Sequence, residues 1–261
     1  MVSEGGKLAR WRGYLQYLAY VIAVAFVGSF VKTLIPLGGI PAEFIATGIT
    51  GAVTANLHAA WTHKTIASPH RMSFMEGIPS RKLWKKLALP AAFHAVTPYI
   101  SMFVLTVLVT LLGLNKGMSP AQSNQYTGAQ VAWFLARAFF ILVMGVACTL
   151  FLCIPAHVTL VRIEASLLPE EHDTIVPFDR TFDGKAVSKL LGGTGSVSFL
   201  DAWKSFNWEA RRRLIKLYVK AFFVIMALML IFVHVMVFEL YIFLGPRLGS
   251  AFAEAKHGMM L

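Results

Sequence analysis

The stretch PAHVTLVRIEASLLPEEHDTIVPFDRTFDGKAVSKLLGGTGSVSFLDAWKSFNWEARRR, residues 155–213, is the only long polar segment of the chain. It lies between two of the most apolar runs of the protein and holds eight of its thirteen acidic residues. A polar segment between apolar runs of 18 or more residues is typical of a loop that joins two membrane-spanning helices. The stretch therefore predicts a large loop on one side of a membrane.

The composition of the whole chain agrees with a membrane protein. Hydrophobic residues make up 57% of the sequence and charged residues 14%, and the mean hydropathy is +0.64. Ordinary globular proteins contain about 25% charged residues. The fold class that we predict is an all-α, polytopic membrane helical bundle. The net charge of +11 comes mostly from basic residues beside the apolar runs, which favours anionic lipid headgroups over nucleic acid as partners.

The apolar runs predict five spans in a single integral membrane domain, residues 1–261. The spans are expected at about 14–37, 41–61, 87–112, 131–161 and 214–244, with the loop at 162–213. One or two interfacial amphipathic helices are expected as well, at Ser80–Leu87 and after Ser198. The second span carries small residues at four-residue spacing, so we expect it to be the buried, closely packed helix.

Basic residues indicate the orientation, because they resist translocation. The N-terminus, the 63–87 connector and residues 162–216 together hold 18 Lys and Arg, whereas the three opposite segments hold 3. The N-terminus is therefore expected inside and the C-terminus outside. The compartment stays open between an endomembrane and the mitochondrial inner membrane.

The two inner loops share short patterns that suggest an internal repeat. His58 precedes Ala67-Ser68-Pro69 in the first, and His157 precedes Ala165-Ser166 in the second. A duplication would give two parallel helical hairpins, an arrangement that is found in transporters. The matches are few, so the sequence leaves duplication and coincidence open.

The wording ASLLPEEHDTIVPFDRTF, residues 165–182, resembles a group of uncharacterised fungal multi-pass membrane proteins. The resemblance extends to residues 61–86 and to LDAWKSFNWEARRRLIKLYVK at 200–220. It implies a fungal origin and an integral membrane protein. Some members carry a ubiquitin carrier or conjugating label, but such an enzyme needs an accessible thiolate, and Cys148 and Cys153 both lie inside an apolar run.

Charged and titratable residues inside the predicted spans form the first candidate site. Four of them fall near the outer ends of their helices, and His234 lies deeper: the set is Lys32, Glu43, Arg137, Glu239 and His234. Intramembrane charges often mark a substrate or ion site. A structural ion-pair network, or side chains that reach back to the interface, would explain them equally well.

The inner ends of three spans carry His58, His94 and His157. Three imidazoles at similar depth suit a transition metal. Each lies on a different helix, however, and no HxxxH or HxxE spacing supports a site. The sequence favours separate interfacial histidines, so it predicts no metal site and no cofactor.

The long loop supplies the second candidate site. Its residues are Thr174, Ile175, Val176, Pro177, Phe178, Asp179 and Arg180, which mix apolar and charged types without helical period. We expect an extended segment that packs on the helix ends and binds a protein partner. No catalytic motif is apparent.

Three functions stay open. The first is a non-enzymatic scaffold, assembly factor or complex subunit, acting through the loop or as a homo-oligomer. The second is a small transporter or channel. The third is an intramembrane lipid or terpenoid enzyme that uses Glu43 and Glu239.

Overall fold

The computed structural model describes residues 11–68, 78–116, 126–186 and 195–245. Its regular elements are helical, and one isolated β-bridge joins Ala67 to Thr174. The chain divides into two compact units, residues 1–206 and 207–261, which are described separately. The prediction of a single membrane domain over 1–261 therefore stays a prediction.

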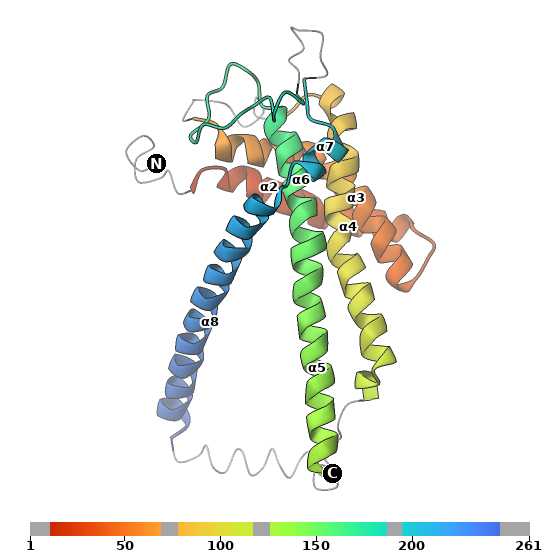
Figure 1. Ribbon diagram of the computed structural model, residues 1–261, viewed down its shortest axis with the longest axis vertical. Helices are drawn as coiled ribbons and strands as arrows, with labels where there is room; N and C mark the ends of the chain where they lie inside the picture. The colour runs from red at the N-terminus through yellow and green to blue at the C-terminus, as the bar shows by residue number, and fades with distance from the viewer. Residues whose placement is uncertain (1–10, 69–77, 117–125, 187–194, 246–261) are drawn as a thin grey trace. The chain divides into compact units, whose positions relative to one another are not determined.

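The first unit contains most of the helices (Figure 1). They are α2 (Tyr14–Leu34), α3 (Gly39–Ile66), α4 (Arg81–Leu111), the 3-10 turn η2 (Leu114–Lys116), α5 (Gly128–Cys148), the π-helical turn η4 (Thr149–Cys153), α6 (Ile154–Ser166) and α7 (Phe199–Lys204). The second unit contains α8 (Trp208–Leu244), whose first turn is capped by the Asn207 side chain.

Within the described residues, four helices are long and apolar enough to cross a membrane: Tyr14–Leu34, Arg81–Leu111, Gly128–Ser166 and Trp208–Phe243. This confirms an all-helical chain that is compatible with multi-pass membrane insertion. α3, which corresponds to the second expected span, is not among these four. The count of five spans therefore stays a prediction.

Helix boundaries differ from the expected ones where helices run on into polar sequence. α4 begins at Arg81, so the segment expected as a separate surface helix forms its first turns. The helix expected to end at 161 continues to Ser166 and takes Glu164 with it. It passes Pro155 because η4 is wider there, and the Ile154 N–H bonds to the carbonyl of Thr149, five residues back.

Pro98 has no N–H to donate to the carbonyl of His94, a loss that usually kinks a helix. α4 nevertheless continues through both Pro90 and Pro98. The Thr97 hydroxyl donates to the His94 carbonyl at 2.8 Å, and so satisfies the acceptor that Pro98 leaves without its usual partner. The hydrogen bond from Thr97 stabilises the helical turn that carries His94.

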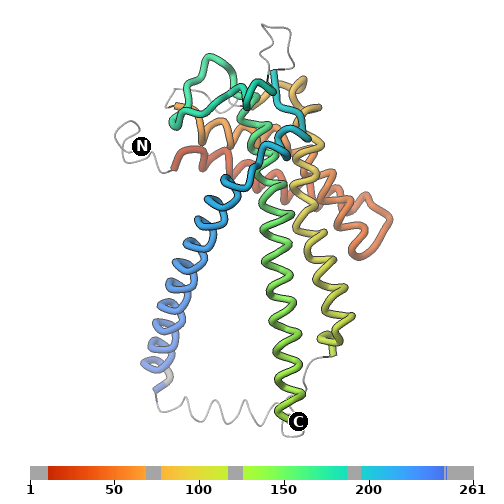
Figure 2. Tube along the Cα trace, in the orientation of Figure 1, coloured from red at the N-terminus to blue at the C-terminus, as the bar shows by residue number. Residues whose placement is uncertain are grey.

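α2 and α3 form an antiparallel pair that runs across α4 (Figures 1 and 2). α3 and α4 approach each other closely at Gly51, where an added Cβ would lie 2.6 Å from the Ala95 Cβ and 2.8 Å from the Ala91 carbonyl oxygen. Gly51, Ala55 and Ala59 are all buried. The small-residue face of the second expected span is confirmed as a packing surface.

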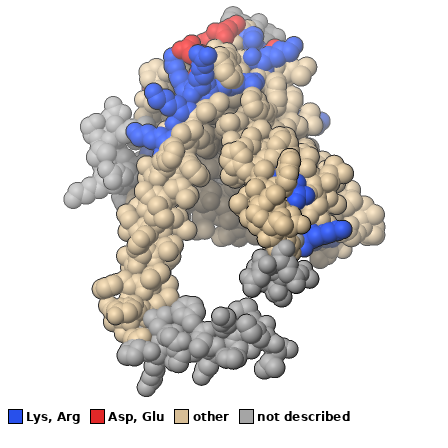
Figure 3. Space-filling model, turned by 60° about the horizontal axis from the view of Figure 1, so that its bottom comes forward, with Lys and Arg blue, Asp and Glu red and all other residues tan. Residues whose placement is uncertain are grey.

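The hydrophobic core of this unit lies where α3, α4, α6, α7 and the α6–α7 loop meet. Its buried residues are Ala55, Ala59, Leu87, Ala91, Leu160, Ile163, Leu167, Val197 and Ala202. The loop is joined to the helices by polar contacts too, since Ile175 N–H donates to the Ile66 carbonyl and Lys86 donates to the Ser196 hydroxyl. Much of the face drawn in Figure 3 is free of charged side chains.

Candidate metal centre

The most polar buried group of the first unit is the carboxylate of Glu164 on α6, whose exposed fraction is 0%. His58 Nδ1 lies 2.6 Å from Oε1, and the Thr62 hydroxyl donates to Oε2 at 2.6 Å. His63 Nε2 bonds to the Glu164 backbone carbonyl at 2.7 Å. His58 and Thr62 are four residues apart on α3, so both reach the same carboxylate from one helix face.

With the carboxylate of Glu164 ionised, these contacts define the tautomer of His58. An ionised carboxylate only accepts hydrogen bonds, so His58 must donate from Nδ1. In the neutral imidazole the lone pair then lies on Nε2, the nitrogen that a metal would use. A carboxylate that orients a histidine in this way is the usual partner of a metal-bound imidazole.

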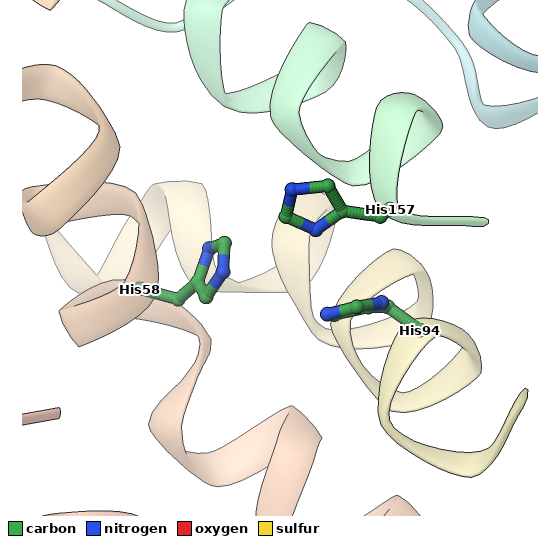
Figure 4. A group of neighbouring side chains, drawn as sticks. All are labelled: His58, His94 and His157. Atoms are coloured by element: carbon green, nitrogen blue, oxygen red, sulfur yellow. The ribbon is translucent and has the colours of Figure 1, made fainter. Parts of the chain in front are cut away.

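Two further imidazoles converge on His58 (Figure 4). His94 comes from α4 and His157 from α6, and their ring centroids are 4.9 Å apart. The His58 ring lies 6.0 Å from that of His94 and 6.3 Å from that of His157. One ring nitrogen from each of the three histidines lies within 4.8 Å of the other two.

His94 carries an unsatisfied polar atom. Its Nδ1 is buried and has no hydrogen-bond partner in the part of the chain that the structure describes. Leaving a buried polar group unpaired costs about 1–3 kcal/mol.

The residues present fit a tetrahedral metal ion with three imidazole ligands. Zinc–nitrogen bonds of about 2.0–2.1 Å at tetrahedral angles place the nitrogens roughly 3.4 Å apart. The observed limit of 4.8 Å requires an inward movement of about 1 Å, which small side-chain rotations supply. Among the described residues no fourth His, Cys, Asp or Glu joins the group, so one coordination position is left open.

The charge balance also favours a cation. Glu164 is fully buried, and its side-chain contacts are a histidine and a threonine, not a lysine or arginine. A buried carboxylate is costly unless a positive charge compensates it. Either a proton on His58 or a metal ion on its Nε2 supplies that charge. The rings of Tyr20 and Trp61, 5.1 and 5.3 Å from His58, keep the site apolar on one side.

The structure brings together only part of the intramembrane cluster expected from the sequence. Lys32 and Glu43 form an exposed ion pair at the turn between α2 and α3. Arg137 instead donates to the carbonyls of Leu112, at 2.7 Å, and Trp133. It therefore caps the end of α4, where helix carbonyls lack partners.

The other two members of that cluster, His234 and Glu239, belong to the second unit. His234 Nδ1 bonds to the carbonyl of Leu230 on the same helix, at 2.6 Å. This is a local backbone contact and indicates no site by itself.

The expected partner-binding residues in the α6–α7 loop largely hold the loop itself. Arg180 donates to the backbone carbonyls of Leu168, Pro169 and His172. Asp179 accepts hydrogen bonds from Thr181 and from the Asp183 N–H. These two side chains therefore fold the loop, which is consistent with the expected extended segment packed on the helix ends.

Val176 and Phe178 behave differently from their charged neighbours in the loop. They point outward, with 62% and 37% of their surface exposed. They are the members of the expected partner-binding set that offer apolar surface to another molecule.

From the sequence, the three histidines were weighed as a metal site, and separate interfacial histidines were favoured instead. Glu164 was not singled out. The reason is the helix boundary. An end at 161 places Glu164 in the loop, whereas a helix to Ser166 places it two turns after His157 on the same face. A histidine and a glutamate seven residues apart on an apolar helix are the signal that would have found the site.

Comparison of the chain with protein-family models, with curated proteins and with solved structures found no match.

Proposed function

We propose that this protein is an integral membrane metalloprotein whose three-histidine centre binds a divalent transition metal ion. The observation that carries the proposal is the convergence of His58, His94 and His157, the first of which bonds through a ring nitrogen to the buried carboxylate of Glu164. Separate interfacial histidines would have no need to converge from three helices or to be oriented by a buried carboxylate, whereas metal ligands have both needs.

Zinc is the metal class that we favour. Imidazole suits zinc, copper, iron and nickel, and the centre has no thiolate ligand that would select copper(I) or an iron–sulfur cluster. Structural zinc sites are closed by four protein ligands, whereas catalytic sites keep a position for water or substrate. Three histidines with an open position therefore favour chemistry on a bound water or substrate over a purely structural role.

The experiment is a competition titration of the detergent-purified protein with Zn²⁺ against a chromophoric chelator. We expect one tight site per chain in the wild type and a loss of at least about 100-fold in affinity for His94→Ala. His234→Ala is the matched control, since it removes an imidazole from another helix, and it should bind as the wild type does. Equal binding by all three proteins would refute the proposal.

For the membrane arrangement we propose five crossings, with the N-terminus inside and the C-terminus outside. The excess of Lys and Arg in the inner segments supports it, as does the length of α3, 28 residues, or about 42 Å at 1.5 Å per residue. A cysteine placed at Gly38 in a Cys148→Ala/Cys153→Ala background should react with an impermeant maleimide from outside. Reaction from inside alone would contradict this arrangement.

A scaffold role through the α6–α7 loop is the second candidate, favoured by the outward apolar side chains of Val176 and Phe178. Their replacement by serine leaves Asp179 and Arg180 to hold the loop. A partner that is lost from mild-detergent purifications of this variant, at unchanged protein abundance, would support the role. If wild type and variant retain the same proteins, the scaffold role fails. The resemblance to fungal membrane proteins stays a prediction.

A further inference from the structure

A second site lies on the other side of His63 from the metal centre. It is a cavity of about 270 Å³ between the end of α3, the start of α4 and the first residues of the α6–α7 loop. Its lining includes Arg12, Lys64, Ser80, Leu83, Leu167 and His172. We call it the basic pocket.

The charges of the basic pocket have one sign. Arg12 and Lys64 line it, and no Asp or Glu is among its described lining residues. Arg12 donates to the Ala67 carbonyl, which holds the guanidinium in place and leaves further N–H groups to donate. A cavity lined by cations and no acids attracts an anion.

The start of α4 strengthens this preference. α4 begins at the pocket, Ser80 makes no capping hydrogen bond with its side chain, and the first turn has no acidic residue. The first N–H groups of a helix lack intrahelical partners and carry partial positive charge. They add backbone donors of the kind that bind phosphate oxygens.

The floor of the basic pocket is apolar, formed by Leu83, Leu167 and Leu168. Next to it, the exposed ring of Trp11 packs edge-on against Tyr14 at 5.5 Å. Exposed tryptophan and tyrosine at a helix end are typical of the membrane–water interface. These features suit the depth of lipid headgroups, where apolar surface lies beside charged groups.

We infer that the basic pocket binds a phosphate ester, through Arg12, Lys64 and the start of α4. Two sources offer this chemistry: the headgroup of an anionic phospholipid and a soluble phosphate compound. The apolar floor and the interfacial tryptophan favour the lipid. The inference is independent of the metal centre, whose ligands do not line this pocket.

The test compares thermal unfolding of the detergent-purified full-length protein with three probes: dioctanoyl phosphatidic acid, dioctanoyl phosphatidylcholine and inorganic phosphate. For the wild type we expect phosphatidic acid to raise Tm by about 4 °C or more, and phosphatidylcholine to have no comparable effect. The double variant Arg12→Gln/Lys64→Gln should lose this rise.

The matched control is Lys82→Gln/Lys85→Gln, which removes two exposed charges from the same end of α4 outside the pocket. It should keep the rise. Should the first double variant fail to fold, Lys64→Gln alone preserves the Arg12–Ala67 bond and should reduce the rise. An equal rise in both double variants, or none in the wild type, would overturn the inference.

The probes also separate the two sources. A rise with inorganic phosphate equal to that with phosphatidic acid, again lost only in the pocket variant, would support a phosphate site that is filled from water. Zinc binding, measured on the same samples, should be unchanged in the pocket variant. The phosphate-site inference and the metal-site proposal can therefore be refuted separately.

Discussion

α5 and α6 belong to one continuous helical rod, residues 128–166, yet they are surrounded in different ways. None of the 21 residues of α5 is buried, whereas eight of the 13 residues of α6 are. α5 is apolar and exposed, as expected of a helix solvated by lipid. α6 buries the carboxylate of Glu164 and presents His157 to the other two histidines. Hydropathy therefore identifies the rod but does not distinguish the half that contributes to the candidate metal centre.

The largest effect should come from Glu164→Ala. It leaves the Nδ1 of His58 and the hydroxyl of Thr62 without their buried partner. We expect a loss of about 3–5 kcal/mol in the free energy of unfolding. Chemical denaturation in a mild detergent measures it.

Glu164→Gln is the matched variant, since it keeps the volume and one acceptor for Thr62. It should be less destabilised than Glu164→Ala but should bind zinc about 10–100-fold more weakly than the wild type. If Glu164→Ala is as stable as the wild type, the carboxylate does not organise this end of the unit.

The next largest difference is expected between leucine-to-alanine variants on the two halves of the rod, in the free energy of unfolding. Leu160 on α6 is 1% exposed and Leu135 on α5 is 60% exposed. Leu160→Ala opens a cavity in the core and should cost about 2–5 kcal/mol. Leu135→Ala exchanges contacts with lipid and should change stability by less than about 0.5 kcal/mol. Equal costs for the two leucines, in the same denaturation assay, would remove the distinction between the halves.

Gly51→Ala should have an intermediate effect, because the new Cβ would meet Ala95 Cβ at 2.6 Å and the backbone of Ala91. Overpacking of this kind costs about 1–3 kcal/mol. Gly128→Ala on α5 is the control, since nothing lies within 4 Å of the added carbon. A shift in Tm for Gly51→Ala alone supports the close contact between α3 and α4, and similar shifts for both argue against it.

The smallest effect concerns pH and the α6–α7 loop. Hydrogen bonds from the Thr181 side chain, and from the N–H groups of Asp183 and Thr181, lower the pKa of Asp179. A depressed pKa stabilises the fold above the unfolded-state value, and this contribution is lost as the pH falls through the folded-state value. The protection of the loop amides against hydrogen exchange, after correction for the intrinsic pH dependence of exchange, should therefore fall below about pH 4. Asp179→Asn should show less of this change, and an identical pH profile for wild type and variant would exclude the mechanism.

Much of the fold follows from the sequence, and the reasons are physical. Long apolar runs predict helices in lipid, and the small face of Gly51, Ala55 and Ala59 predicts close packing. Helix ends were less certain, because proline usually ends or kinks a helix. At Pro155 a π-helical turn accommodates the missing N–H donor. At Pro98 the Thr97 hydroxyl donates in place of the missing N–H. Neither of these two compensating arrangements is visible in a hydropathy pattern.

The candidate centre could not be predicted for a related reason. His58, His94 and His157 are dispersed over three helices, and only the packing of α3 against α4 and α6 brings them together. Lys32 and Glu43 were easier to pair, since a short turn joins their helices. Spacing along the chain reveals sites on one helix, but not those built from three.

X-ray absorption spectroscopy at the zinc edge tests the central claim most directly, on protein purified from cells supplied with zinc. One equivalent of zinc is expected, with nitrogen and oxygen ligands at about 2.0–2.1 Å and the scattering pattern of three imidazoles. His94→Ala should lose the metal or one imidazole from that pattern. Metal well below one equivalent in the wild type, or a spectrum that His94→Ala leaves unchanged, would contradict the account.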